Sequence, residues 1–319
     1  MTFEENLAAA LQSGLQKAED ILAIRRAARA RRTQALQSNQ KKMALRIQAA
    51  TPGAAAPAVE FQTAGFLAAA GDSWFDYPFH DVLKILDDNY GYNVESSAHK
   101  GDPIERIAYA GGQMEDFARK LEKIKARGVV PKAALVSGGG DDVAGAEFGM
   151  LLNNAFSPIA GSDDDVVDGV LNQRIRTAFT YLLGSITAFC QEAFQKKVPI
   201  LVHGYDYPVP DGRGFLGGWP FPGPWLDPGF REKNFPKDND EELKKRIQMM
   251  QDIMSKFNNM VKALPSQPGL EHVVYVDLRG TLSNKLPDYK DWWANELHPT
   301  QKGFEAVTAR FAAELAKLP

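Results

Sequence analysis

The chain divides into two regions that differ in hydrophobic periodicity. Residues 2–48 contain no proline, and apolar side chains recur there at steps of three or four, the spacing of one face of an α-helix. The stripe consists of Phe3, Leu7, Leu11, Leu15, Ala18 and Leu22. Such a stripe has to be buried. We therefore predict that residues 1–48 form an amphipathic helical segment, which either packs on the rest of the chain or pairs with a second copy of itself.

From residue 61 onward, short apolar runs alternate with helical patterns. Residues 49–60 are small and proline-containing, which predicts a linker. The predicted strands are 65–70, 92–97, 132–137, 199–203 and 272–277, and the predicted helices are 81–89, 114–127, 170–197, 240–264 and 300–317. This alternation is typical of a parallel sheet covered by helices. We expect one such domain over residues 61–319.

Composition narrows the class of protein. Of the 319 residues, 44% are hydrophobic and 24% are charged, which excludes wholesale disorder and a fibrous repeat. The single cysteine, Cys190, excludes an internal disulfide framework and a multi-cysteine zinc site. No run of about 18 apolar residues predicts a transmembrane helix, and the N-terminus, with Glu4 and Glu5, lacks the apolar core of a signal peptide. These features favour the cytoplasm, although non-classical export would leave no mark in the sequence.

The net charge of −3 conceals an asymmetry between the two regions. Residues 1–50 hold nine Lys or Arg against four Asp or Glu. Five of the nine are Arg25, Arg26, Arg29, Arg31 and Arg32. A basic helix can contact nucleic acid or anionic lipid, but charge runs of this kind are more often solvated helix faces. We expect no nucleic-acid partner.

Polar residues follow the predicted strands where each one ends. The segments are 71–74, 98–102, 138–142 and 204–207, with 295–299 before the last helix. In parallel α/β sheets, ligands bind at the carboxyl ends of the strands. Several polar clusters that meet at one edge are more than a stable sheet requires, so this edge is the predicted functional site.

These segments resemble the four sequence blocks of the SGNH (GDSL-type) hydrolase family, over roughly residues 66–304. The blocks are Gly71-Asp72-Ser73, then Gly101, then Gly139-Gly140-Asp141-Asp142, and finally Asn295-Glu296-Leu297-His298-Pro299. A three-letter GDS is weak evidence alone, whereas four blocks in order are a strong signal for the fold. The resemblance implies a three-layer α/β/α, flavodoxin-like SGNH hydrolase fold with a five-stranded parallel sheet, here with an extra N-terminal helix.

The resemblance also implies roles for particular residues. Ser73 would be the nucleophile and His298 its general base, because an alcohol is a weak nucleophile until an adjacent base takes its proton. The oxyanion would be held by the backbone N–H groups of Ser73 and Gly101 and by the side chain at position 141. A bare glycine backbone lets an N–H approach the substrate oxygen closely.

Two positions depart from the family pattern. Asp141 stands where the family has Asn, and a carboxylate can donate a hydrogen bond to an oxyanion only if it is protonated; otherwise Asp142 or a backbone N–H would have to take over. Asn295 stands where the family has the Asp that orients the histidine. In a serine protease triad that change costs roughly 10⁴ in rate. Glu296 is a second candidate for orienting His298.

Residues 205–236 are rich in aromatic side chains, proline and glycine, without periodicity. Loops of this length are usually functional or disordered, and this one is too aromatic for ordinary disorder. We interpret it as a lid or wall for an apolar or ring-bearing substrate, with a structural flap on the sheet edge as the alternative. The candidate substrate-contacting residues are Trp74, His203, Tyr205, Tyr207, Trp219 and Trp225. For His203, a buried structural role is the alternative.

The predicted function is that of a carboxylic ester hydrolase, an esterase or lipase that forms an acyl-enzyme on Ser73. The expected substrate is a small-molecule or lipid-like ester with an apolar or aromatic acyl group, and no metal or organic cofactor is implied. Three alternatives stay open: a carbohydrate O-deacetylase, a weakly active or non-catalytic ligand-binding protein of the same fold, and a protein whose main feature is residues 1–48 as a targeting or homo-oligomerising helix.

Overall fold

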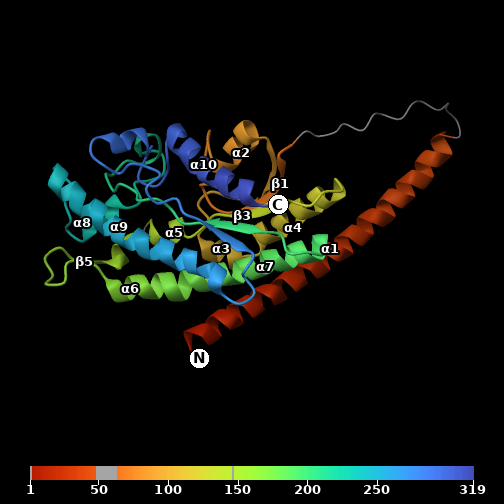
Figure 1. Cartoon of the computed structure of the whole chain (residues 1–319), viewed down its shortest axis with the longest axis horizontal. Helices are drawn as coiled ribbons and strands as arrows, with labels where there is room; N and C mark the ends of the chain where they lie inside the picture. Colours follow the sequence, from red (N-terminus) through yellow and green to blue (C-terminus); the bar gives the residue numbers. More distant parts are fainter. Residues whose placement is uncertain (1, 48–62, 146) are drawn as a thin grey trace.

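The computed structural model describes residues 2–47, 63–145 and 147–319, and its centre is a five-stranded parallel sheet (Figure 1). The strands lie in the order β2–β1–β3–β6–β7. Their bounds are β1 Gly65–Ala70, β2 Tyr92–Ser96, β3 Ala133–Val136, β6 Ile200–His203 and β7 Val273–Val276. This order is the flavodoxin-like one, in which the chain reverses direction across the sheet beside the first strand. The five predicted strands are confirmed, and the reversal point lies where β1 ends.

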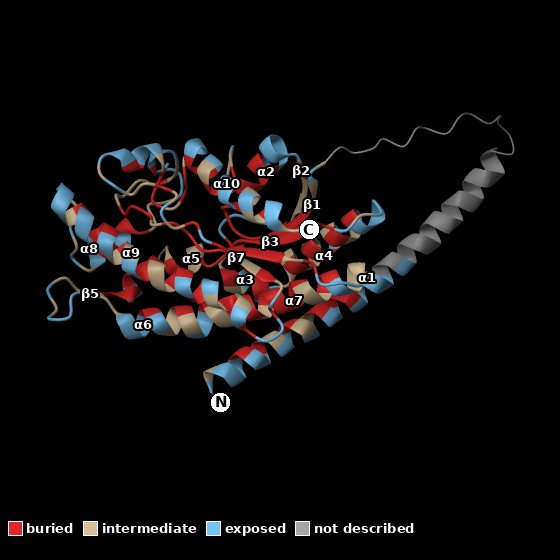
Figure 2. Ribbon diagram, in the orientation of Figure 1, coloured by how far each residue is buried: buried red, intermediate tan, exposed pale blue. Residues whose placement is uncertain are grey.

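The central strands are nearly continuous apolar runs because helices cover both faces of the sheet. In β1, β3 and β6 almost every residue is buried, as the red strands of Figure 2 show. One face carries α2 (Val82–Tyr90) and α10 (Gln301–Lys317). The other carries α3 (Ile104–Tyr109), α4 (Gly112–Ala126), α7 (Arg176–Phe194) and α9 (Asp240–Ala263). The predicted three-layer α/β/α architecture is therefore confirmed.

The remaining elements are short and lie in the connections. They are α5 (Gly140–Val143), α6 (Asp164–Asp168), α8 (Asp227–Glu232), the two-stranded hairpin of β4 (Leu152–Asn153) and β5 (Gly161–Ser162), a π-helical turn (Gly169–Ile175) that leads into α7, and 3₁₀ turns at Phe148–Leu151, Phe215–Gly217, Leu264–Ser266 and Asp288–Asp291. The sequence pattern did not predict α5, α6, α8 or the hairpin, whereas the π-helical turn coincides with the start of the predicted helix 170–197. The described helices include none that is both long and apolar enough to cross a membrane.

The N-terminal helix α1 (Phe3–Ile47) packs its apolar stripe on α7. The two helices approach so closely that a Cβ at Gly14 would lie 2.1 Å from the Tyr181 carbonyl oxygen. Ser185 Oγ donates a hydrogen bond to the Gly14 carbonyl at 2.8 Å. Of the two predicted partners for the stripe, the structure therefore shows the chain's own domain. The predicted linker, 49–60, lies outside the described residues.

Two arginines of the basic run are paired within the chain. Arg25 Nη2 lies 2.5 Å from Glu122 Oε2 on α4, and Arg26 forms ion pairs with Glu19 and Glu192. Arg25 is thus largely buried against α4, with 14% of its side chain exposed, whereas 41% of the Arg26 side chain is exposed, and the chain itself supplies counter-charges to both. The side chains of the other three arginines lie outside the described residues.

Candidate active site

The carboxyl end of β1 is held by contacts from two other elements. Gly71 is close to β3, since a Cβ there would lie 2.7 Å from Ser137 Cβ. On its other side the Gln113 side chain, at the start of α4, accepts from the Gly71 N–H at 2.7 Å and donates to the Gly71 carbonyl at 3.2 Å. No motif in the sequence marks Gln113, whose partner Gly71 lies 42 residues away in the chain. Its amide acts as a short backbone mimic that positions the turn before Ser73.

Asp72 shapes the turn from inside the core. Its carboxylate accepts hydrogen bonds from the Trp74 backbone N–H at 3.0 Å, from Ser137 Oγ at 2.6 Å and from the Tyr205 hydroxyl. Three donors satisfy a carboxylate that is 2% exposed, as buried charges require. Asp72 therefore fixes the backbone that presents Ser73.

Ser73, His298 and Asn295 meet at this edge. His298 Nε2 lies 2.7 Å from Ser73 Oγ, and His298 Nδ1 lies 3.1 Å from Asn295 Oδ1. The same Asn295 oxygen accepts the backbone N–H groups of Leu297 and His298 at 3.0 and 2.9 Å. This is the arrangement of a hydroxyl nucleophile, its base and a group that orients the base.

The Tyr77 ring covers one face of the His298 imidazole. The sequence did not point to Tyr77 as a site residue. Its ring stacks on His298 with centroids 4.3 Å apart, and its hydroxyl accepts from Asn295 Nδ2 at 3.0 Å. Burial lowers the pKa of His298 to about 3 and raises that of Tyr77 to about 12. His298 is therefore neutral near pH 7, the state that a general base needs. The sequence indicates only that Tyr77 lies in the segment after β1, at the predicted functional edge, and does not indicate which residue it contacts.

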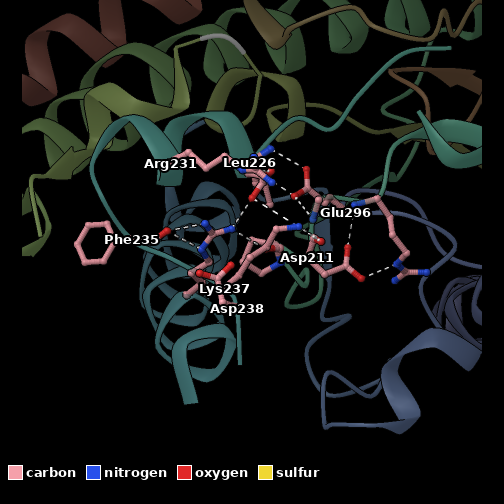
Figure 3. A network of polar contacts seen from close by, with 12 residues as sticks. Asp211, Leu226, Arg231, Phe235, Lys237, Asp238 and Glu296 are labelled. Carbon is pink, nitrogen blue, oxygen red and sulfur yellow. Dashed lines mark hydrogen bonds and ion pairs between the residues drawn. The ribbon is translucent and has the colours of Figure 1, made fainter. Parts of the chain in front are cut away.

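Glu296 does not orient His298, which corrects the expectation that it could replace Asn295 in that role. Its carboxylate turns away and accepts four backbone N–H groups of the aromatic loop (Figure 3). The donors are Gly212 at 2.9 Å, Trp225 at 2.6 Å, Leu226 at 2.8 Å and Asp227 at 3.1 Å. Glu296 thus ties residues 212–227 to the loop that carries Asn295 and His298.

A second tie holds the same loop region in place. Arg246 on α9 is buried and pairs with Asp227 at 2.6 Å, while it also donates to the Phe235 carbonyl at 3.1 Å (Figure 3). Buried charges in such pairs are destabilising unless all partners are present. Two buried side chains from outside the aromatic stretch, Glu296 and Arg246, therefore hold it in place.

The predicted oxyanion residues border the same cavity as His298. Gly101 has a φ of 78°, a left-handed conformation that favours glycine. Asp142 accepts from the Ile104 N–H at 2.7 Å, which ties the loop after β3 to the loop that carries Gly101. Ser73, Gly101 and Asp141 all line one cavity of about 410 Å³.

Four of the eleven residues that line the cavity are Phe, Tyr or Trp. Besides the oxyanion residues and His298, the lining includes Tyr77, Phe215, Phe221 and Trp225. The volume is in the range of small-molecule sites. A second cavity, of about 30 Å³, lies behind Ser73 among Val143, Met250 and Met254, with room for about one or two water molecules.

The predicted substrate-contacting residues divide into two groups. Trp225 lines the larger cavity, and Trp74 and Tyr205 line the small inner one. The remaining three, His203, Tyr207 and Trp219, border neither cavity. His203 is fully buried, with Nε2 2.8 Å from Ser137 Oγ. The Tyr207 hydroxyl lies 3.3 Å from Ser255 Oγ, and Trp219 is 95% exposed. Of the two roles considered for His203, the structure therefore supports the buried structural one. Trp74 also donates through Nε1 to the Leu297 carbonyl at 3.1 Å, which joins the nucleophile loop to the histidine loop.

Within the part of the chain that the structure describes, no group of three or more His, Cys, Asp or Glu side chains is placed to hold a metal ion.

The chain matches no family model and no curated protein. Among solved structures it is similar to a member of the lipolytic protein G-D-S-L family from Veillonella parvula DSM 2008, at 12% identity and a TM-score of 0.41, with 79% of this chain and 99% of that one covered. It is also similar to the lipase/acylhydrolase from Enterococcus faecalis, at 13% identity and a TM-score of 0.34, with 80% and 97% covered. At such values the activity of this chain has to be inferred from its own residues.

Proposed function

We propose that this chain is a serine hydrolase that cleaves carboxylic esters through an acyl-enzyme. The observation that carries the proposal is the 2.7 Å contact between Ser73 Oγ and the neutral His298 Nε2, at the wall of a 410 Å³ cavity. A serine hydroxyl hydrogen-bonded to an oriented imidazole is an activated nucleophile. A structural role alone would not need this pair to line a cavity of that size.

The reaction follows from the positions of these groups. Ser73 Oγ attacks the ester carbonyl carbon while His298 Nε2 takes the hydroxyl proton, and the carbonyl oxygen becomes an oxyanion beside Gly101 and residue 141. When the carbon–oxygen bond to the alcohol breaks, His298 returns the proton to the leaving oxygen. Water then attacks the acyl-enzyme with His298 again as base, the bond between the acyl carbon and Ser73 Oγ breaks to release the carboxylic acid, and His298 returns the proton to Ser73 Oγ. Asn295 holds the imidazole ring in the orientation that both steps use.

The cavity supports an ester with an apolar or ring-bearing portion. Tyr77, Phe215 and Trp225 provide flat apolar walls next to Ser73, and aromatic walls bind apolar and ring-shaped groups through area and edge contacts. Lipid-like and aromatic esters fit this lining. The alternative of a non-catalytic binding protein has one observation in its favour, the unpaired carboxyl of Asp141 at the oxyanion position.

Active-site labelling tests the proposal. A fluorophosphonate should label the wild-type chain once, on Ser73, and the protein should hydrolyse at least one of a panel of acetyl, octanoyl and benzoyl nitrophenyl esters. Ser97→Ala is the matched control, since Ser97 is 8% exposed, against 9% for Ser73, and belongs to the loop after the neighbouring strand. Labelling should persist in that variant. Absence of both labelling and turnover would favour the binding protein.

Phe215→Ala should raise KM for an apolar nitrophenyl ester about tenfold with a smaller effect on kcat, because the ring is part of the cavity wall and loses about 1–2 kcal/mol of apolar contact. Trp219→Ala serves as the control in the same loop, since Trp219 is 95% exposed and does not line the cavity. Steady-state kinetics of the two variants decide the point. A larger KM change for Trp219→Ala would place the substrate on the outer surface of the loop.

A further inference from the structure

Asp141 is an unpaired carboxyl group within the site. Its Oδ2 is buried, and neither of its oxygens accepts a hydrogen bond from any described residue. The residue lines both the 410 Å³ cavity and the small cavity, in each case together with Ser73. An ionised carboxylate that is buried without a donor is strongly disfavoured. The position therefore favours the neutral form of the acid.

The charges around Asp141 act in the same direction. The titratable groups that face it are Asp72 and Tyr205 from the core, Asp102 from the loop after β2, the adjacent Asp142, and Lys100 and His298 across the cavity. No described lysine or arginine forms an ion pair with it, and the nearby Arg174 pairs with Glu105 instead. Burial, and then the negative charges of Asp72, Asp142 and Asp102, raise the pKa of Asp141 to about 8.

We propose that Asp141 is a catalytic residue that works as a neutral carboxylic acid. Its O–H donates a hydrogen bond to the oxyanion that forms on the substrate's carbonyl oxygen when Ser73 Oγ attacks. This inference rests on the proposed ester hydrolysis. The O–H keeps its proton throughout, since the proton that moves is the one from Ser73 Oγ, which passes to His298 and then to the leaving alcohol. A carboxylic acid kept neutral by its surroundings is a known oxyanion donor in another enzyme.

Asn295 complements this role. The groups that contact the imidazole of His298 are Ser73, Asn295, Tyr77 and Trp225, none of which carries a charge near pH 7. A carboxylate at position 295 would favour the protonated imidazole, whereas the amide leaves it neutral into the acid range. Between about pH 3 and pH 8, His298 is therefore neutral while Asp141 is protonated. An Asp at position 141 and an Asn at position 295, the reverse of the family pattern, thus shift the pH range of activity toward low pH instead of removing activity.

The first test is the pH dependence of kcat/KM between pH 5 and 10 for the wild type and two variants. The wild-type value should fall about tenfold per pH unit above pH 8 as Asp141 ionises, whereas Asp141→Asn, a permanent donor, should not show this fall. Asp142→Asn is the matched control, since Asp142 is the next residue and lines neither cavity. It should keep a falling limb that begins at lower pH than in the wild type, because the variant loses a negative charge that helps to raise the pKa of Asp141. A flat wild-type profile to pH 10, or the same limb in Asp141→Asn, overturns the proposal.

The second test needs no catalysis. Between about pH 4 and 8 the native state holds a proton on Asp141 that the unfolded chain has released, so the contribution of Asp141 to wild-type stability should decline across that window as pH rises. Asp141→Asn lacks this loss, so its advantage in unfolding free energy should grow from pH 5 to pH 8 and then level off. Denaturant unfolding at each pH measures it.

The two tests separate the two proposals. Ester turnover together with a pH-independent stability difference overturns the protonated Asp141 and leaves the hydrolase intact. A stability difference that grows with pH, with no turnover or labelling in either protein, overturns the ester hydrolase and with it the donor role.

Discussion

Ser73→Ala is expected to lower kcat for ester hydrolysis by about 10⁵–10⁶-fold and to abolish fluorophosphonate labelling. The magnitude follows from the loss of the covalent pathway, because removal of a serine nucleophile costs about as much as removal of the whole nucleophile–base unit. Ser73 Oγ has His298 as its hydrogen-bond partner, and the loss of one oxygen leaves no sizeable cavity. The thermal midpoint should therefore shift by less than about 2 °C.

The same logic predicts how a second variant combines with the first. His298→Ala should lower kcat by a similar factor, and the double variant should be no slower than either single one, because nucleophile and base act as one unit. Single-turnover kinetics on a nitrophenyl ester would show this. Retention of more than a tenth of wild-type activity in Ser73→Ala would remove Ser73 from the nucleophile role, and additive losses would mean that His298 acts elsewhere.

The sheet was predictable because its strands are short, buried and bounded by glycine or polar residues. The run at 65–70 is apolar from end to end and is followed by Gly71, and the structure begins and ends β1 at these same residues. The hairpin of β4 and β5 could not be predicted in this way. Each of its strands has two residues, which is too short for any periodicity to appear.

The site residues divide along a similar line. Ser73 and His298 could be proposed because each belongs to a recognisable sequence block, although their contact joins positions 225 residues apart. Gln113 and Tyr77 could not, because their roles depend on which loops the strand order brings together. Glu296 shows the remaining difficulty. The preceding residue, Asn295, contacts His298, whereas the Glu296 carboxylate accepts a backbone N–H of the aromatic loop.

Glu296→Ala is expected to lower the free energy of unfolding by more than about 3 kcal/mol. The side chain is fully buried and accepts four backbone N–H groups. Alanine would leave these donors without a partner, and each buried unsatisfied group costs about 1–3 kcal/mol before the chain relaxes. Glu296→Gln should also destabilise, because its NH₂ group would face N–H donors in place of one oxygen.

The loss should extend to activity, since Glu296 joins the wall that carries Trp225 to the loop that carries His298. Denaturant unfolding should be compared with Glu305→Ala, an exposed glutamate on α10 whose one described partner is Gln301 on the same helix. Substitution at such a surface position usually changes stability by less than about 0.5 kcal/mol. If Glu296→Ala lost no more than this control, the aromatic loop would be held by the Arg246–Asp227 pair alone, and the histidine loop would keep its place without the carboxylate beside it.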